Sequence, residues 1–473
     1  MYLNVNHETS NPYLHIEKRG DVSMKKMKKQ ALVICGLGFG DECKGSITDW
    51  LARKHSAHTV IRYNGGAQAA HNVVLSDGRH HTFSQFGSAT FIPGVRTHLS
   101  KFVLVNPIGM LIEARKLADV GVIDALSRTT IDERALLVTP FHCSVNRLRE
   151  LARGSGRFGS CGQGIGETVR DAKMRQGPVL TMSDLCNFRQ LKKKLIEVQE
   201  MKAAHAKEIQ MADDVATVYG QAIEREFKPL HSVKVVDEYV EWYRHFVKAN
   251  TIVPPHHVAA VLARDGCTLF EGAQGALLDE THGFHPYVTW SNTTIANASS
   301  ILKEASYDGQ IERYGLLRAY ATRHGSGPFV TEKQDLTQEL PDTHNRMHEW
   351  QREFRVGWFD LVAAKHALSF AGPIDHLAIS CIDRLEHLPV MKACIAYEYK
   401  NVNHGEEIFR DPRTQKTGIA NALAECRPVY QCKSLFTNTK HFLDFIENEL
   451  GISIAIESHG PTEKDKKFRL KMS

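Results

Sequence analysis

Short apolar runs separated by longer polar stretches restrict the possible folds of this 473-residue chain more than any other feature. A sheet whose parallel strands are buried on both faces contains nearly continuous apolar strands joined by helices. Such runs occur at Leu32–Cys35, Thr59–Tyr63, Phe102–Val105, Leu136–Thr139, Thr268–Phe270, Tyr314–Ala319, Leu377–Ser380 and Ile452–Ile456. The alternation predicts an α/β fold with a central, mainly parallel β-sheet flanked by helices.

The chain divides by texture, without an evident linker. Residues 1–29 are polar and end in a lysine cluster, which predicts a disordered N-terminal tail, with Met24 or Met27 as an alternative start. Residues 30–473 are expected to form one catalytic domain. Within it, the long, charged and periodic segment of about 184–262 predicts a helical insertion.

Charge and cysteine usage exclude several classes of protein. A formal net charge of +5 is small for this length, so no nucleic-acid-binding surface is indicated. The ten cysteines lack zinc-ligand spacing, and no signal peptide is recognisable, which is typical of reduced thiols in the cytoplasm. No apolar stretch approaches the roughly 18 residues that span a bilayer. We therefore expect a cytoplasmic enzyme.

The first apolar run leads into a glycine-rich turn, residues 36–45, with the sequence GLGFGDECKG. Small residues let backbone N–H groups approach phosphate oxygens, a lysine neutralises charge, and a carboxylate binds Mg²⁺ or accepts a proton. The Walker spacing GxxxxGK[ST] is absent. The turn alone is therefore as consistent with a structural turn as with a nucleotide phosphate site.

Further segments follow this turn in a fixed order: YNGGAQAAH at 63–71, GSCGQGIG at 159–166, EGAQG at 271–275 with PYVTWSNTT at 286–294, TRHGSGPF at 322–329, RVGWFD at 355–360 and SHGP at 458–461. With GDECKG at 40–45, they resemble in order and spacing the signature blocks of adenylosuccinate synthetase. The resemblance covers roughly residues 31–465. It implies a P-loop-NTPase-like α/β fold with helical insertions and an NTP-dependent purine nucleotide ligase.

The reaction that the resemblance implies is phosphorylation of the 6-oxygen of IMP, or of a related purine monophosphate, and its displacement by an amino acid. A purine 6-oxo group is a poor electrophile, and phosphoryl transfer makes its oxygen a leaving group. The resemblance assigns N1-proton removal to Asp41, phosphate binding to Lys44, general acid catalysis to His71 and the 6-oxygen contact to Gln274. Mg²⁺ would bind Asp41 and the Ala70 carbonyl. Taken singly, an Asp-Glu turn is commonly a helix cap and a lone histidine is commonly structural.

The resemblance also assigns substrate contacts. Those with the monophosphate are Gln68, Ser160, Cys161, Leu278, Thr289 and Arg175. Arg175 matches an arginine that family members contribute across a homodimer interface, and its alternative is a plain surface charge. Those with the nucleoside triphosphate are Gly40, Glu42, Cys43, Gly45, Asp383, Ser458 and Gly460. Those with the amino acid are Arg352 and Arg355.

The amino-acid loop departs from the family pattern. Two threonines and two arginines of the family are replaced, respectively, by Glu349 and Trp350 and by Glu353 and Phe354. A carboxylate near the position of the aspartate substrate's own carboxylate is repulsive in a partly desolvated site. Aspartate is the default amine, while a less negative amine, another amino acid, or a rearranged loop that uses Arg346 and Arg352 stay open.

The triphosphate site departs as well. Asp383 keeps an acceptor pair for the N1–H and N2–H edge of guanine, whereas Cys381 replaces a lysine of the family. We therefore expect GTP, with ATP as the competitor. Cys43 replaces a glycine, at a cost of about 1 kcal/mol if its φ is positive. In the second loop, Ala67, Gln68 and Ala70 replace histidine, asparagine and glycine.

Three hypotheses remain open from the sequence. The leading one is a ligase of the adenylosuccinate synthetase type. The second is a ligase on another purine, such as one that converts (d)GMP to a 2-amino succinyl product, against which the retained Asp41 argues. The third is a non-catalytic nucleotide-binding paralogue. Survival of Asp41, Lys44, His71 and Gln274 together argues against that third reading.

Overall fold

A computed structural model describes residues 28–175, 177–342, 350, 353–411, 415, 418–431, 436 and 438–469. Of the predicted N-terminal tail only Lys28 and Lys29 are among these residues, and Lys29 pairs with Asp308. Residues 1–27 lie outside the described part of the chain.

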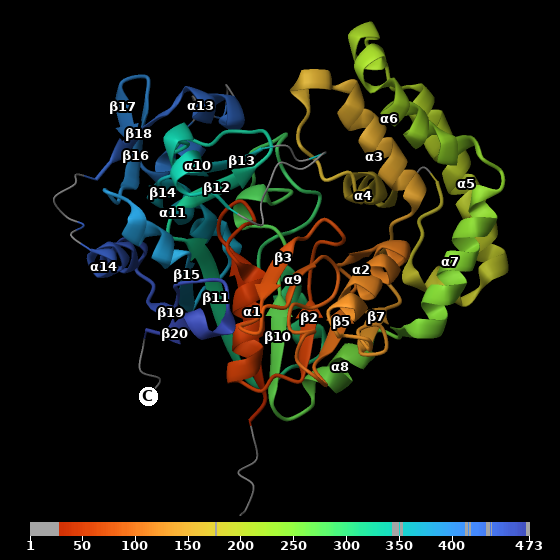
Figure 1. The fold of residues 1–473 in the computed structure, drawn as a ribbon, viewed down its shortest axis with the longest axis horizontal. Helices are drawn as coiled ribbons and strands as arrows, with labels where there is room; N and C mark the ends of the chain where they lie inside the picture. The colour runs from red at the N-terminus through yellow and green to blue at the C-terminus, as the bar shows by residue number, and fades with distance from the viewer. Residues whose placement is uncertain are drawn as a thin grey trace, which may run out of the picture.

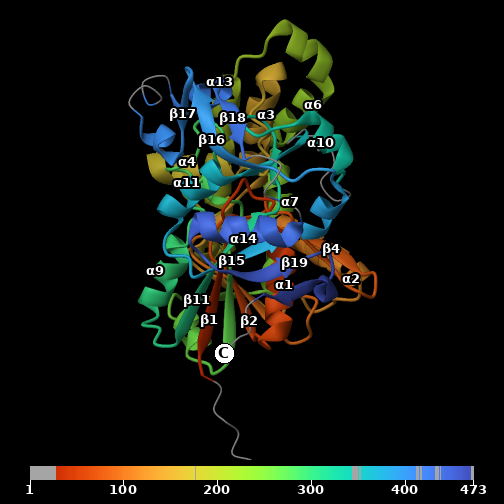
Figure 2. The same ribbon diagram turned by 90° about the vertical axis from the view of Figure 1, so that its left-hand side faces the viewer.

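A ten-stranded sheet forms the centre of the molecule (Figures 1 and 2). Its strands, in spatial order, are β20 (Lys466–Phe468), β19 (Ile454–Ser458), β15 (His376–Ser380), β11 (Gln310–Arg318), β1 (Gln30–Gly36), β10 (Cys267–Glu271), β2 (Thr59–Arg62), β5 (Arg96–Leu99), β7 (Thr129–Asp132) and β9 (Thr251–Val253). All neighbours pair in parallel except β20, which is antiparallel to β19. The predicted α/β fold with a mainly parallel central sheet is confirmed.

Both faces of the central strand β1 are covered, as the continuous apolar run predicts. Leu32 and Ile34 pack in one buried cluster with Trp50 of α1 (Lys44–Lys54). Val33, which points to the opposite face, packs with residues of α8 (His257–Leu262) and α9 (Ala296–Glu304). Alternate side chains of one strand therefore anchor helices on the two faces of the sheet.

A lobe of helices stands beside the β5–β7–β9 edge of the sheet (Figure 1). It consists of α2 (Pro107–Asp119), α3 (Pro140–Ala152), α4 (Ile165–Met174), α5 (Phe188–Lys207), α6 (Asp213–His231) and α7 (Val235–Ala249). The segment 184–262, predicted as a helical insertion, contains α5, α6 and α7 and then returns to the sheet through β9 and α8.

The other edge of the sheet carries a second set of elements, most of which pack in one cluster with strands β15 and β19. Its members are α10 (Gln334–Glu339), α11 (Leu361–Ala371), α13 (Ile419–Glu425), α14 (Thr439–Leu450), β12 (Ala321–His324), β13 (Phe354–Gly357), β14 (Phe359–Asp360), β16 (Ala393–Tyr399), β17 (Val402–His404) and β18 (Arg427–Tyr430). β12 pairs with β13, and β16 pairs with β14, β17 and β18. A separate hairpin is formed by β3 (His71–Val74) and β4 (His80–Phe83).

Two of the predicted strand runs lie outside the main sheet. Phe102–Val105 and Leu136–Thr139 contribute β6 (Leu104–Val105) and β8 (Leu136–Leu137), which pair with each other, while Leu104 and Leu136 also form single bridges to Gly66 and Thr181. Their places in the sheet are taken by β5 and β7, whose sequences RTHL and TTID lack an apolar run. Threonine suits a strand, and the buried Thr129 hydroxyl donates to the Ala125 carbonyl at 2.8 Å.

None of the helices in the described ranges combines the length and the apolar character needed to cross a bilayer.

Candidate active site

The glycine-rich turn between β1 and α1 is shaped by a buried ion pair. The Glu42 carboxylate accepts from the Gly40 N–H at 2.7 Å and from Lys44 Nζ at 2.8 Å, and Lys44 also donates to the Gly40 carbonyl at 2.7 Å. A Cβ at Gly36 would stand 2.3 Å from the Glu42 carboxylate, so only glycine leaves room for it. Glu42, predicted as a triphosphate contact, therefore points into the interior of the loop, whereas Lys44 still reaches the cavity described below.

A second loop, residues 271–275 after β10, packs directly on this turn. A Cβ at Gly275 would lie 2.2 Å from the Gly38 carbonyl, so the two backbones are in contact. Gln274 has a positive φ of 58°, and its Oε1 accepts from Gln68 Nε2 at 3.4 Å. The loops that follow β1, β10 and β2 thus converge at the carboxyl ends of three adjacent parallel strands, where α/β sheets bind ligands.

His71, the first residue of β3, is held between these loops. A Cβ at Gly45 would stand 2.7 Å from the His71 Cβ, so helix α1 and strand β3 meet at closest approach there. Nδ1 of His71 lies 2.6 Å from the Glu271 carboxylate, while its buried Nε2 has no hydrogen-bond partner among the described residues. One ring nitrogen is therefore fixed by the protein and the other is available to a ligand.

Electrostatics sets the charge state of this pair. Burial lowers the pKa of His71 to about 4, against the opposing effect of Glu271. Although burial raises the pKa of Glu271, Arg62 and His71 bring it down to about 2, and Ser88 adds a backbone N–H at 3.0 Å. The imidazole is therefore neutral and the carboxylate ionised at neutral pH, and a phosphoryl oxygen near Nε2 would favour the imidazolium.

Asp41 and His71 line the same cavity. Burial raises the pKa of its carboxyl group, while the neighbouring His324 and Arg318 lower it. Arg318 extends from the end of β11, donates from Nε to the Asp41 carbonyl and pairs with Asp342 at 3.3 Å. Sequence reasoning missed Arg318, although an arginine inside the apolar run Tyr314–Ala319 was a visible signal.

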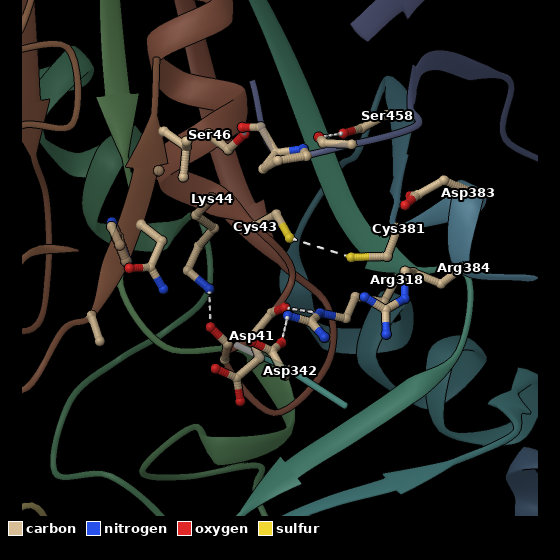
Figure 3. A pocket seen from close by; sticks show the side chains of 18 of the residues that line it. Asp41, Cys43, Lys44, Ser46, Arg318, Asp342, Cys381, Asp383, Arg384 and Ser458 are labelled. Carbon is tan, nitrogen blue, oxygen red and sulfur yellow. Dashed lines mark hydrogen bonds and ion pairs between the residues drawn. The ribbon is translucent and has the colours of Figure 1, made fainter. Parts of the chain in front are cut away.

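One cavity joins most of the predicted triphosphate and catalytic residues (Figure 3). Its lining consists of Gly40, Asp41, Cys43, Lys44, Gly45, Ser46, Ala70, His71, Asn72, Val74, Arg318, Tyr320, Asp342, Cys381, Asp383, Arg384, Ser458, Gly460 and Pro461. Asp383 lies in the 3-10 helix Ile382–His387 that follows β15, and Ser458 ends β19. Segments that lie between residues 40 and 461 of the sequence thus form the walls of one pocket.

The predicted monophosphate contacts lie outside the lining of this cavity. Asn146 of α3 donates to Ser160 Oγ at 2.8 Å and accepts from the Gly164 N–H at 3.1 Å, so it shapes the loop of residues 159–166. Burial raises the pKa of Cys161 to about 11, so its thiol is neutral. Two further predicted contacts are joined to each other, because the Thr289 N–H donates to the Leu278 carbonyl at 2.8 Å. Asn146 carried no signal in the sequence.

The predicted amino-acid site is only partly described. Arg352 and Glu349 fall outside the described residues. Arg355 donates to the carbonyls of Gly325 and Gly327 at 2.8 and 3.0 Å and pairs with Glu332 at 2.7 Å. Its guanidinium therefore holds the neighbouring loop, and only its buried Nε lacks a partner in the described part of the chain.

Two more residues of this region are placed by the structure. Trp350 is buried, and the Arg147 guanidinium lies 5.7 Å from its ring centre. Arg175 is exposed at the end of α4 with a φ of 51°. Trp350 therefore packs toward the loop of residues 159–166, and Arg175 stands at the surface of the described chain.

Comparison with known proteins assigns the chain to a family. A sequence model of the adenylosuccinate synthetase family matches residues 33–466. The adenylosuccinate synthetases of Chlorobium chlorochromatii and Thermosynechococcus vestitus are 31% and 33% identical to it, over 93% and 91% of this chain and 97% and 92% of theirs.

Solved structures agree in fold. The fully ligated adenylosuccinate synthetase of Plasmodium falciparum superimposes with a TM-score of 0.71 at 22% identity, covering 93% of this chain and 99% of its own. The cyanophage S-2L succinoaminodeoxyadenylate synthetase bound to dGMP and dATP superimposes with a TM-score of 0.56 at 15% identity, covering 94% and 96%. From the family match and the length over which its relatives agree, the chain belongs to the adenylosuccinate synthetase family.

Proposed function

We propose that this family member is a C–N bond-forming ligase that joins an amino acid to C6 of a purine nucleotide, with IMP and aspartate as its default substrates. The observation that carries the proposal is the buried Nε2 of His71, which lacks a partner among the described residues while Glu271 holds Nδ1. A buried polar atom of this kind is normally hydrogen-bonded, either to water or to a ligand atom. The glycine-rich loop in the same cavity favours a phosphoryl oxygen as that atom.

The chemistry follows from the positions of these side chains. Asp41, whose pKa is raised by burial, accepts the N1 proton of the purine, and the 6-oxygen attacks the γ-phosphorus with release of the nucleoside diphosphate. His71 stabilises the transferred phosphoryl group, and Gln274, oriented by Gln68, binds the 6-oxygen. The amine then attacks C6, and inorganic phosphate leaves.

The cavity fits Mg²⁺ bound together with a triphosphate. The Asp41 carboxylate and the Ala70 carbonyl are oxygen ligands on its wall. Within the described ranges no three His, Cys, Asp or Glu residues are grouped as a metal site. This suits a cation that takes most of its ligands from phosphates and water. When bound, it would neutralise charge on the transferred phosphoryl group.

GTP is the proposed phosphoryl donor. The Asp383 carboxylate lines the cavity beside Ser458 and Gly460, and a carboxylate can accept both N1–H and N2–H of guanine. Adenine presents no such pair of donors, so ATP would leave this half-buried acceptor unmatched.

The identity of the amine is the least constrained part of the proposal. Arg355 donates mainly to backbone carbonyls, and Trp350 packs toward the loop of residues 159–166. These contacts differ from a loop whose arginines are all available to a carboxylate substrate. An amine other than aspartate is therefore the second candidate, on the same reaction path.

A homodimer and a cytoplasmic location complete the proposal. Arg175 is exposed at the end of α4 and has the long cationic side chain needed to reach a phosphate in a neighbouring subunit. Nucleotide substrates and reduced thiols suit the cytoplasm. Sedimentation analysis of the wild-type protein checks the dimer. Activity assays on mixtures of Arg175→Ala and His71→Asn subunits check the shared site, because a mixed dimer would recover part of the activity.

The decisive test is a substrate panel read by mass spectrometry. Purified protein is incubated with Mg²⁺, GTP or ATP, one of IMP, GMP or dGMP, and each common amino acid in turn. The expected product has the mass of IMP plus aspartate minus water, with one phosphate released per product. His71→Asn is the matched negative variant, and His256→Asn, which changes an exposed histidine, is the control.

Other outcomes would revise the proposal in defined ways. An adduct with a different purine or amino acid would keep the ligase reaction and replace the substrates. Triphosphate binding without any adduct in the whole panel would contradict the ligase and favour a non-catalytic nucleotide-binding protein.

A further inference from the structure

The two cysteines that depart from the family pattern in the triphosphate site face one another. Cys43 precedes α1 and Cys381 precedes the 3-10 helix of Asp383, and their sulfur atoms are 3.7 Å apart across 338 residues of sequence (Figure 3). We propose that this pair is a modification site, a dithiol that peroxide oxidises to a disulfide and that thereby closes the triphosphate cavity. The chemistry stands on the geometry alone, whereas its regulatory effect rests on the proposed function.

Both cysteines have the same left-handed backbone conformation. Cys43 has φ 62° and ψ 35°, and Cys381 has φ 59° and ψ 35°. This left-handed conformation is unfavourable for a residue with a Cβ, by about 1 kcal/mol or more at each position. β1 and β15 lie on either side of β11 and run parallel to it. The turns that carry Cys43 and Cys381 follow these two strands, so they lie close together at the same end of the sheet.

Both thiols are accessible from the cavity, which they line together with Asp41 and Asp383. Cys161 and Cys426 are likewise half-buried, whereas Cys35, Cys143, Cys267 and Cys394 are buried and Cys186 is exposed. Cys43 and Cys381 differ from these in that they form a sulfur–sulfur hydrogen bond with each other. Small oxidants can therefore reach this pair, and a bound nucleotide would cover it.

The surroundings of the pair suit thiol oxidation. The two sulfur atoms share a hydrogen bond at 3.7 Å, and the Arg318 guanidinium belongs to the lining of the same cavity. A cation beside a pair of thiols favours a thiolate, which attacks an oxidant, and the second thiol then resolves the product.

The reaction balances with hydrogen peroxide as the oxidant. The Cys43 thiolate attacks one peroxide oxygen, the O–O bond breaks, and a sulfenic acid forms while hydroxide takes up a proton as water. The Cys381 sulfur then attacks the sulfenic sulfur, the S–O bond breaks, and a second water leaves with the thiol proton. Two thiols are oxidised to one disulfide and one peroxide is reduced to two waters. A dithiol reductant reverses the step.

Closure of this bond would change the cavity. A disulfide has an S–S length of roughly 2.05 Å, so the sulfurs must approach each other by about 1.7 Å. The covalent link then joins the phosphate loop to the turn that carries Asp383, on the wall where a nucleotide would lie. We therefore expect the oxidised protein to bind triphosphate more weakly, and bound triphosphate to slow the oxidation.

The covalent step is tested by peptide mapping. Reduced full-length protein is treated with hydrogen peroxide, alkylated, digested and analysed by mass spectrometry. The expected product joins the peptides of Cys43 and Cys381 with the loss of two hydrogen atoms, and dithiothreitol removes it. Cys186→Ser is the matched control and should still form the link, whereas Cys43→Ser and Cys381→Ser should not. In Cys381→Ser, dimedone should capture a sulfenic acid on Cys43. Absence of the link in the wild-type protein, with oxidation spread over other cysteines, overturns the proposal.

The effect on the cavity is tested separately with GTP and ATP as probes. Oxidised protein should bind the preferred triphosphate at least about tenfold more weakly than reduced protein. Saturating triphosphate should slow the formation of the link by a similar factor. Unchanged affinity after complete oxidation overturns the closure of the cavity. If the link forms and gates binding but no substrate yields an adduct, the ligase proposal fails and the dithiol stands.

Discussion

The glycine-rich turn of residues 36–45, called the phosphate loop after its proposed role, and the region around Arg355 use their charged side chains in opposite ways. Around the phosphate loop, the pairs Glu42–Lys44 and His71–Glu271 are buried at 2.8 and 2.6 Å, and the second pair leaves one ring nitrogen facing the cavity. Around Arg355, donors go to the carbonyls of Gly325 and Gly327, which are parts of the loop itself. The first region is organised around a ligand, whereas the second is organised around its own backbone.

This difference teaches where divergence is tolerated. Lys44 and His71 are fixed by buried carboxylates, and a change in either leaves a buried charge without compensation. An arginine such as Arg355 can be redirected to the backbone without such a loss, because carbonyls satisfy its donors well. Departures from the family pattern lie at residues 349–354, at Ala67, Gln68 and Ala70, and at Cys43 and Cys381, while Asp41, Lys44, His71 and Gln274 are retained.

The largest expected effect is on catalysis, and it would break the comparison if absent. Asp41→Asn and His71→Asn should each lower the rate of phosphate release by about 10³-fold, since each removes a proton-transfer or charge-stabilising group. Nucleotide binding should stay measurable by equilibrium dialysis. Asp77→Asn and His256→Asn change exposed residues and serve as controls. Near-normal turnover in either active-site variant would refute the assigned roles.

A pH effect on stability follows from the buried imidazole. Unfolded histidine titrates near pH 6.5 and folded His71 near 4, so the fold disfavours the imidazolium. The contribution of neutral His71 to the free energy of unfolding is complete above pH 6.5. As the pH falls from 6.5 toward 4, the free energy of unfolding decreases by up to about 3 kcal/mol. Urea denaturation at successive pH values should show this slope in the wild-type protein and a shallower one in His71→Asn. Identical slopes would mean that His71 is not buried as described.

Packing in the first region gives a third prediction. Gly45→Ala places a Cβ 2.7 Å from the His71 Cβ and should lower the free energy of unfolding by about 2 kcal/mol, because α1 and β3 must separate. Gly220→Ala is the control, since nothing lies within 4 Å of its added Cβ and it is helical. That change should be neutral or stabilising by up to about 1 kcal/mol. Equal effects of the two substitutions in urea denaturation would contradict the close contact.

The smallest expected effect sharpens the description of the second region. Arg355→Lys cannot donate to two carbonyls and a carboxylate at once, so we expect about 1 kcal/mol less stability. The KM for the amino acid should rise several-fold while kcat changes little. Arg79→Lys, at an exposed ion pair, is the control. Should kcat fall instead of the KM rising, Arg355 would belong to the catalytic region.

Much of this architecture could be predicted from local sequence patterns. The apolar runs located six strands of the main sheet, because a strand buried on both faces must be apolar along its length. The short strands β5, β7 and β9 on one side of the sheet, and β20 at its other edge, escaped detection, since each contains at most two consecutive apolar residues. The ordered blocks predicted the family, which the comparisons confirm.

The candidate site divides in the same manner. The glycine-rich turn was recognisable in the sequence because closely packed turns require residues without a Cβ. A Cβ at Gly36 or Gly38 would collide with the Glu42 carboxylate. Arg318 and Asn146 did not, since a polar side chain at the end of a strand or on a helix has many possible partners.

The sequence by itself determined that this chain forms a mainly parallel α/β sheet with a glycine-rich turn after its first strand, and to which family it belongs, because these depend on residues that are near one another along the chain. The tertiary structure alone decided that Glu271 orients His71 across 200 residues and that Cys43 meets Cys381 across 338. Strand order in the sheet brings these residues together, and that order is set by packing of whole helices and strands. No local pattern of residues records it.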